Sequence, residues 1–529
     1  MLVQKHCRMS ICALFAALSG ACALPESDAH GSAVDATNSE QQPLTVGSDV
    51  NTIPIDPMRS IMVTDLNGFA LVKDRYPLGK LLGEAADHFN AKTGAKYNTR
   101  GDWVTNPFAD ARDEFNRHND SADDVRIGVV DYGNPYNRLL RLWPELANTP
   151  NNIGAGPFRL LAVVNRLDAA GDLDARGLHP AARDPRTFGE GRLIFGLVDP
   201  NHESNTGNPY PMTLIIEYRL PALDSNLNVI PNYDYRAAMG TDQRAQWQVQ
   251  MERWGKVWRE LSRWSPTTAA YQDHLAGIVN RFTNVENFIA IRSTSKLVGQ
   301  AGNPEFELRE WYILQTQQTL IPRKPRDEPY RCASTGEDLG KIAAHYWVPD
   351  RLDLKKEHLD PNNLANEIGY TLPRDAGEYP VGGLANPIRG CPVNSNGVPK
   401  LFEQADTDTL GNDGIKHRVT APFGRVKENE VWALPGQGEN MRHALAMATC
   451  TGCHSKEAGL FGFHVAPRMP NTTSALSRFL RGGSIAVFQS NGVSYNYNEL
   501  TKRKNFLQRA STKDSTLAPY DGLWRSDRM

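Results

Sequence analysis

No stretch of the 529-residue sequence approaches the roughly 18 consecutive apolar residues that a membrane-spanning helix needs. Basic residues are not in excess, because 58 Lys and Arg stand against 60 Asp and Glu, for a formal net charge of −2. Binding of nucleic acid would require a basic face, so we expect no nucleic-acid partner. A P-loop, an H-E-x-x-H motif and a G-x-S-x-G nucleophile elbow are also absent from the sequence.

Cysteine is scarce, and the seven in the chain divide into small groups. Two lie in the N-terminal segment, one follows it directly, and two belong to a C-x-x-C-H motif. This leaves Cys332 and Cys391 as an even remainder. In an oxidising compartment such a pair predicts a disulfide, and two separate buried thiols are the alternative.

The N-terminus has the pattern of an export signal. Lys5 and Arg8 precede a short apolar stretch at residues 9–18, which is too short to span a membrane. Small residues then lead to Cys22 and resemble the lipobox of bacterial lipoproteins, although Ser19 stands where that pattern usually has leucine. We expect a signal peptide at residues 1–21 and lipidation of Cys22. Ordinary cleavage before an incidental Cys22 is the alternative.

The predicted location is therefore the periplasm or the cell surface. We expect an outer-membrane lipoprotein that contacts the membrane through its lipid anchor. Residues 22–57 are rich in Ser, Asp, Asn, Gln and Pro and are predicted to form a disordered tether.

Residues 58–325 show the patterns of an α+β domain, with a mixed sheet and helical cover. Helical periodicity recurs at residues 77–94, 134–146, 242–264 and 269–282, and strand patterns at 158–164, 192–198, 212–220, 287–291 and 306–314. The tryptophans of the third helix, Trp247, Trp254 and Trp258, fall on one face and are predicted to be core. Residues 326–430 are rich in turn-forming residues. Residues 431–529 are predicted to be a small, mainly α, haem c-binding segment similar to a cytochrome c unit.

The motif that carries chemistry is Cys450-Thr451-Gly452-Cys453-His454. Two thiols three positions apart can bond the two vinyl groups of one porphyrin, and the adjacent histidine can ligate its iron. A helical pattern at residues 439–449 precedes the motif. The prediction is haem c, bound by Cys450, Cys453 and His454.

Three other interpretations of the motif stay open. The first is a chance match or a simple disulfide. The second is a zinc site of Cys450, Cys453, His454 and His464, a Cys₂His₂ set. The third is a thioredoxin-like redox motif, which a preceding helix disfavours because that motif begins a helix.

Two downstream residues are candidates for the second axial ligand of the iron. They are His464 and Met469, with Met469 slightly favoured, and methionine would raise the reduction potential relative to histidine. Arg468 is a candidate partner of a haem propionate. Residues 473–480 are predicted to form a helix over the haem edge.

Residues 439–469 resemble the start of a monohaem cytochrome c domain. The strings PFRLLAVVNRLD, GEGRLIFGLVD and TLIIEYRLPA resemble a largely uncharacterised family of large exported bacterial proteins. That family also ends in a C-x-x-C-H segment followed by an F-x-H-V-x-P-R-like stretch, here residues 463–468. The resemblance implies a shared architecture and no particular reaction, and it favours His464 as a ligand.

These observations predict an exported, lipid-anchored, c-type cytochrome-like electron-transfer protein with an unknown redox partner protein. One alternative is a single-haem redox enzyme of the peroxidase or oxidase kind, which would need an open iron face. Another is a non-redox surface protein with a Cys₂His₂ metal staple.

Overall fold

The computed structural model describes residues 44–93, 103–104, 108–109, 135–169, 188–231, 233, 243–298, 304–314, 319–323, 330–332, 346–348, 423–427, 454, 458, 462–482, 486–487, 494–495 and 497–517. All of them belong to one of the two units into which the chain divides, Gln41–Met529. The predicted signal peptide at 1–21 and the predicted helix at 439–449 lie outside the described residues.

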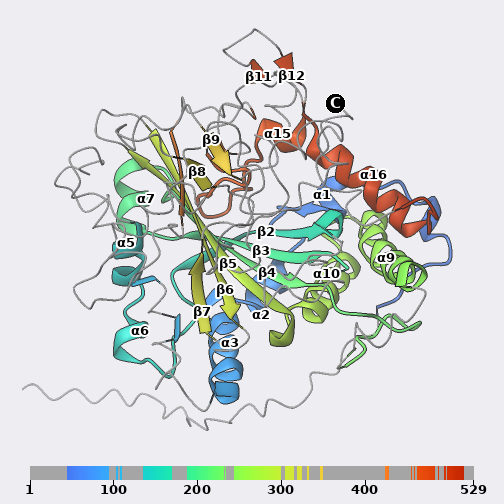
Figure 1. Ribbon diagram of the computed structural model, residues 1–529, viewed down its shortest axis with the longest axis horizontal. Helices are drawn as coiled ribbons and strands as arrows, with labels where there is room; N and C mark the ends of the chain where they lie inside the picture. Colours follow the sequence, from blue (N-terminus) through green and yellow to red (C-terminus); the bar gives the residue numbers. More distant parts are fainter. Residues whose placement is uncertain are drawn as a thin grey trace, which may run out of the picture. The chain divides into compact units, whose positions relative to one another are not determined.

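A sheet of antiparallel strands forms the centre of this unit (Figure 1). Five long strands pair in chain order: β2 (Phe158–Arg166), β3 (Glu190–Leu197), β4 (Met212–Arg219), β5 (Phe288–Val298) and β6 (Pro304–Leu314). The short strand β1 (Met62–Val63) extends the sheet beside β2, while β7 (Thr319–Arg323) and β10 (Phe423–Lys427) both pair with β6. Two small strand pairs stand apart from it: β8 (Tyr330–Cys332) with β9 (Tyr346–Val348), and β11 (Ala486–Val487) with β12 (Ser494–Tyr495).

The α+β class with helical cover is confirmed, but the expected mixture of strand directions is wrong. Every strand pair in the described part of the sheet is antiparallel. The reason is visible between β4 and β5, which two helices connect, α9 (Gln243–Glu260) and α10 (Ala269–Phe282). A single crossover helix would return the chain parallel, whereas this helical pair returns it antiparallel.

The four helices predicted within residues 58–325 are present. Besides α9 and α10, the structure has α3 (Leu78–Thr93) over the first predicted segment. The second predicted segment, 134–146, is divided into α5 (Pro135–Leu142) and α6 (Glu145–Asn148). The break falls at Trp143-Pro144, because proline has no amide hydrogen to continue the helix. Shorter helices complete the set: α1 (Pro57–Ser60), α2 (Ala70–Arg75), α7 (Pro200–Thr206), η1 (Val50–Thr52), η2 (Leu167–Ala169), η3 (Leu261–Arg263) and η4 (Val285–Asn287).

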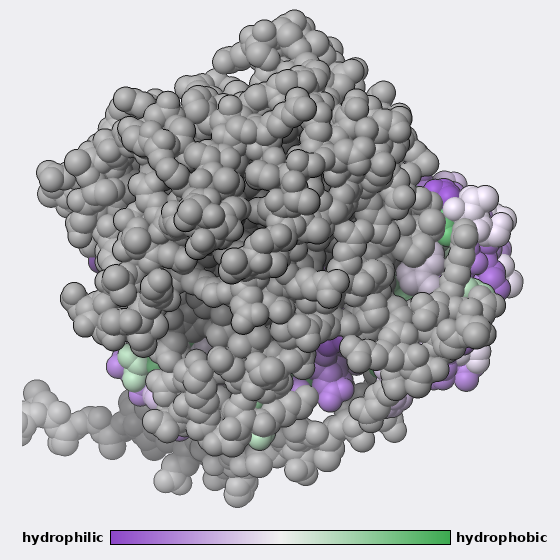
Figure 2. Space-filling view, viewed as in Figure 1, coloured by the Kyte–Doolittle hydropathy of each residue, from purple (hydrophilic) through white to green (hydrophobic). Residues whose placement is uncertain are grey.

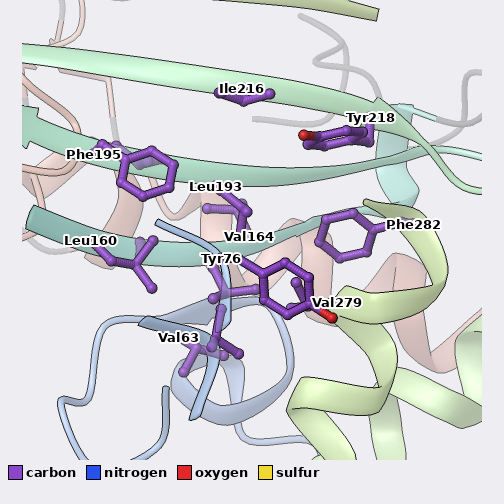
Figure 3. Close-up of a cluster of buried hydrophobic side chains, with 14 of the residues drawn as sticks. Val63, Tyr76, Leu160, Val164, Leu193, Phe195, Ile216, Tyr218, Val279 and Phe282 are labelled. Atoms are coloured by element: carbon purple, nitrogen blue, oxygen red, sulfur yellow. The ribbon is translucent and has the colours of Figure 1, made fainter. Parts of the chain in front are cut away.

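The main core lies between one face of the sheet and the helices. Tyr218 of β4 packs against Phe282 of α10 with ring centroids 5.9 Å apart (Figure 3). The tryptophan face of α9 belongs to this core as predicted, since Trp247, Trp254 and Trp258 are all at most 3% exposed. These rings are therefore structural, and each adds apolar area removed from water.

The body begins earlier in the chain than predicted. Leu44, Val50 and Ile55 are buried in the core, although they lie within the predicted tether at 22–57. Arg259 of α9 fixes this segment by donating to the carbonyls of Ile53 (2.9 Å) and Asn51 (2.6 Å). The polar composition of the segment conceals these few, well-spaced apolar side chains.

The C-terminal part of the chain packs on the same body. Helix α16 (Glu499–Ser511) lies along α9 (Figure 1), and Arg259 also donates to the Ser511 hydroxyl at 2.9 Å. A short helix, α15 (Arg478–Arg481), occupies only the end of the predicted helix 473–480. The residues before it are extended instead, because Leu476 pairs with Val465 in a β-bridge.

The described surface is polar. Met58 is the one large apolar side chain exposed among the described residues, and described side chains beside α16 are mostly hydrophilic (Figure 2). None of the described helices combines the length and apolar content needed to span a membrane.

Candidate haem-attachment site

His454, the histidine of the C-x-x-C-H motif, is held by one backbone carbonyl. Its Nδ1 lies 2.7 Å from the carbonyl oxygen of Gly462. A carbonyl only accepts hydrogen bonds, so Nδ1 carries the proton and the lone pair of the neutral ring is on Nε2. Metal-ligating histidines are commonly oriented by such a bond from the second ring nitrogen.

Aromatic side chains surround this imidazole. The ring of Phe306 on β6 lies nearly parallel to it, with centroids 5.0 Å apart and an interplanar angle of 19°. Phe463 meets Phe306 edge-on at 5.1 Å. Burial lowers the pKa of His454 to about 4, the hydrogen bond to Gly462 opposes this, and the charge of Arg292 adds to it. His454 is therefore neutral near pH 7, which is the form that binds a metal.

His464 lies against His454. The two ring centroids are 4.4 Å apart at an interplanar angle of 56°. Ser477 holds His464 twice: its hydroxyl is 2.9 Å from Nδ1, and its amide donates to the His464 carbonyl at 2.9 Å. Phe479 of α15 adds a ring contact at 5.0 Å. The second histidine is thus as firmly positioned as the first.

Met469 lies at the other end of the same hairpin. His464 pairs with Ser477 at the base, and the Met469 carbonyl accepts from the Thr472 amide (3.4 Å) at the turn. Of the two predicted axial ligands, the structure therefore brings only His464 next to His454.

Arg468 contacts the sheet through its own side chain. It is 6% exposed and donates to the Leu160 carbonyl of β2 at 2.9 Å. Its guanidinium also lies 6.0 Å from the ring centroid of Phe69. Arg468 was a predicted partner of a haem propionate, whereas in the structure it anchors the hairpin to β2.

The predicted cysteine sites fall mostly on residues that the structure does not describe. Cys22, Cys391, Cys450 and Cys453 lie outside the described residues, so lipidation, the disulfide and the two thioether positions stay predictions. Cys332 lies opposite Tyr346 in the backbone register of β8 and β9. Within the described ranges, no three His, Cys, Asp or Glu side chains gather into a metal site.

A group of charged side chains on the sheet was not predicted from the sequence. Glu217 of β4 lies 3.0 Å from Arg192 of β3 and 3.0 Å from Arg292 of β5, and Glu190 lies 2.5 Å from Arg192. Both carboxylates are fully buried. The sequence contained one signal, charged residues two positions apart in otherwise apolar strands, as in Glu190-Gly191-Arg192.

The described residues fit a haem-attachment site in two respects. His454 presents a neutral imidazole with its lone pair on Nε2, and Phe306, against which Phe463 packs, supplies an apolar ring beside it. Comparisons of the chain with protein-family models, with curated proteins and with solved structures found no match.

Proposed function

We propose that this protein is an exported, lipid-anchored electron-transfer protein that carries one covalent haem c. The observation that supports this most is the 2.7 Å hydrogen bond between His454 Nδ1 and the Gly462 carbonyl. It puts the histidine of the C-x-x-C-H motif in the tautomer that ligates iron through Nε2.

Each residue of the site has a distinct part in this proposal. Cys450 and Cys453 would hold the porphyrin by thioether bonds, and His454 would ligate its iron. The bound haem supplies one-electron chemistry, exchanged with a redox partner protein. Phe306 covers one face of the imidazole and Phe463 packs on Phe306, and a low-dielectric surrounding tunes the redox potential of a metal. Of the two predicted second ligands, only His464 touches His454, and this contact bears on the alternative in which both rings share one metal ion.

Production with the c-type haem maturation machinery tests this proposal. Wild-type protein is expected to show a Soret band, a mass gain of one porphyrin, and haem staining on a denaturing gel. The double variant Cys450→Ala/Cys453→Ala is expected to lose the stain, because covalent attachment needs these thiols. Cys332→Ala is the matched control, a cysteine outside the motif, and is expected to stain like wild type. A colourless, correctly exported wild-type protein would contradict the proposal.

A structural metal site is the second candidate, and the contact between the two histidine rings favours it. A porphyrin places its two axial ligands on opposite faces and keeps them apart. At 4.4 Å, His454 and His464 are close enough to bind one metal ion together, with Cys450 and Cys453 completing a Cys₂His₂ set. Metal analysis distinguishes the structural metal site from haem c. Bound zinc without a Soret band would support the metal site and exclude haem c.

Carbon monoxide distinguishes an electron carrier from a single-haem enzyme. A ferrous haem with two protein ligands refuses the gas, and this result would support an electron carrier. Rapid binding would indicate an open iron face and would favour the peroxidase or oxidase alternative.

The lipid anchor has its own test: Cys22→Ser is expected to move the protein from the membrane fraction to the soluble fraction.

A further inference from the structure

Glu190, Arg192, Glu217 and Arg292 form a buried ionic network across three neighbouring strands. Glu217 lies between the two arginines, 3.0 Å from each. The side chains of Arg192 and Arg292 are each only 12% exposed. Desolvation cancels most of the attraction in such a network, so it contributes little net stability. A fixed array of charge in a low-dielectric setting has another effect, because its field acts strongly on nearby groups.

The network lies on the same face of the sheet as the ring that supports His454. In the register of β5 and β6, Lys296 pairs with Phe306. Alternate residues of a strand share a face, so Phe306 shares its face with Arg292, four residues before Lys296. The imidazole of His454 lies parallel to Phe306 at 5.0 Å.

We propose that Arg292, held in place by Glu217, raises the reduction potential of the metal centre at His454. This inference rests on the proposed haem c. Ferric haem carries one positive charge more than ferrous haem, so a fixed cation on the supporting sheet face destabilises the oxidised state. Glu217 has the opposite effect and also keeps the guanidinium in position. Arg292 is thus a tuning residue that need not touch the porphyrin.

Spectroelectrochemical titration of the matured protein tests the proposal. Arg292→Gln is expected to lower the potential, and Arg292→Lys, which keeps the charge, to stay near wild type. At an effective dielectric constant of about 20, a unit charge roughly 10 Å away changes the redox equilibrium on the order of tenfold. For one electron this corresponds to about 59 mV. Glu217→Gln is expected to shift the potential in the opposite direction.

Arg192→Gln is the matched control. It removes the other arginine that pairs with Glu217, but β3 is two strands further from β6 than β5 is. Its effect on the potential is expected to be clearly smaller than that of Arg292→Gln. Equal shifts in the two variants, or an unchanged potential in Arg292→Gln with haem attached, would overturn this inference and leave the proposed function intact. A wild-type protein without haem would overturn both.

Discussion

Gly255 of α9 and Ser511 of α16 are in direct backbone contact. A β-carbon built on Gly255 would lie 2.6 Å from the Ser511 amide nitrogen and 2.9 Å from its Cα. The two helices approach this closely because glycine has no side chain to hold them apart. The C-terminal helix, which follows the candidate haem site in the chain, therefore docks at a position that only glycine fits.

We expect Gly255→Ala to destabilise the protein by about 2 kcal/mol, since overpacking against rigid backbone costs roughly 1–3 kcal/mol. The better helix propensity of alanine, about 1 kcal/mol, offsets part of this cost. Denaturant unfolding measures the change. Gln246→Ala, at an exposed position of the same helix, is the control and should be nearly neutral. A Gly255→Ala protein as stable as wild type would show that the contact is not tight.

Stability should fall between about pH 6.5 and pH 4 through His274. Burial lowers the pKa of this histidine to about 4, from 6.5 in the unfolded chain, while Nε2 bonds the Val257 carbonyl at 2.9 Å. The unfolded state binds the proton more tightly, so the stability is fully present above pH 6.5 and is lost as the pH falls towards 4. A shift of this size corresponds to about 3 kcal/mol.

The variant His274→Gln tests this pH dependence, because glutamine does not titrate. Unfolding free energies measured across the same pH range are expected to fall less steeply for the variant than for wild type. Parallel curves would assign the pH dependence to other groups. His454 also has a lowered pKa, so part of the slope is expected to persist in the variant.

Gly462→Ala should disturb His454 through the backbone alone. Gly462 has φ +134°, and a β-carbon there would meet nothing within 4 Å. The cost is therefore conformational, about 1–3 kcal/mol, and relief of the strain would move the carbonyl away from Nδ1. Imidazole nitrogen NMR should then show His454 losing its single tautomer.

Gly207→Ala is the control for this experiment. Gly207 also has positive φ (+66°) and free space around its β-carbon, but it ends α7. It should cost similar stability and leave the His454 signals unchanged. If both variants preserve the tautomer, the Gly462 carbonyl does not control His454.

Arg468→Ala should loosen the hairpin from β2. The change leaves the buried Leu160 carbonyl without the guanidinium that bonds it, at a cost of about 1.5–3 kcal/mol. Arg468→Lys should not restore the lost stability, because the ammonium group of lysine cannot reproduce the planar, forked N–H donors of a guanidinium group. Limited proteolysis of residues 462–482, with the exposed Arg481→Ala as control, measures the effect. Equal resistance in Arg468→Ala would contradict an anchoring role.

Elements with a clear hydrophobic period could be predicted from the sequence. Helix α10 has the predicted bounds because its apolar residues recur at three- and four-residue spacing. Strand β5 was predicted too short, because its second half contains Ser293 and Thr294, which are buried yet polar. Their hydroxyls are satisfied across the sheet, with Ser293 bonding Tyr136 at 2.6 Å. A polar residue whose hydrogen-bond partner comes from a distant segment is therefore predicted to be exposed, although it is buried in the structure.

The candidate site was predictable only in part, for a similar reason. His454 is recognisable because the chemistry of its motif is local in sequence. Its backbone partner Gly462 and its neighbour Phe306 could not be recognised from the sequence. Every residue has a carbonyl, so the hydrogen bond has no sequence pattern, and β6 lies far away in the chain. The ion pair of Glu217 and Arg292 depends on the register of β4 and β5, which the helices between them separate by almost 70 residues. Helix α16 was not predicted because charged residues interrupt the apolar pattern of its buried face.

Arg259 joins the beginning and the end of the described chain in one guanidinium group. It bonds the carbonyls of Asn51 and Ile53 and, 252 residues later, the hydroxyl of Ser511. This contact cannot form while the C-terminus is still being synthesised, and closing so long a loop is slow. The full set of hydrogen bonds at Arg259 therefore forms only after synthesis has passed Ser511, and the motif cysteines, Cys450 and Cys453, precede that residue in the chain.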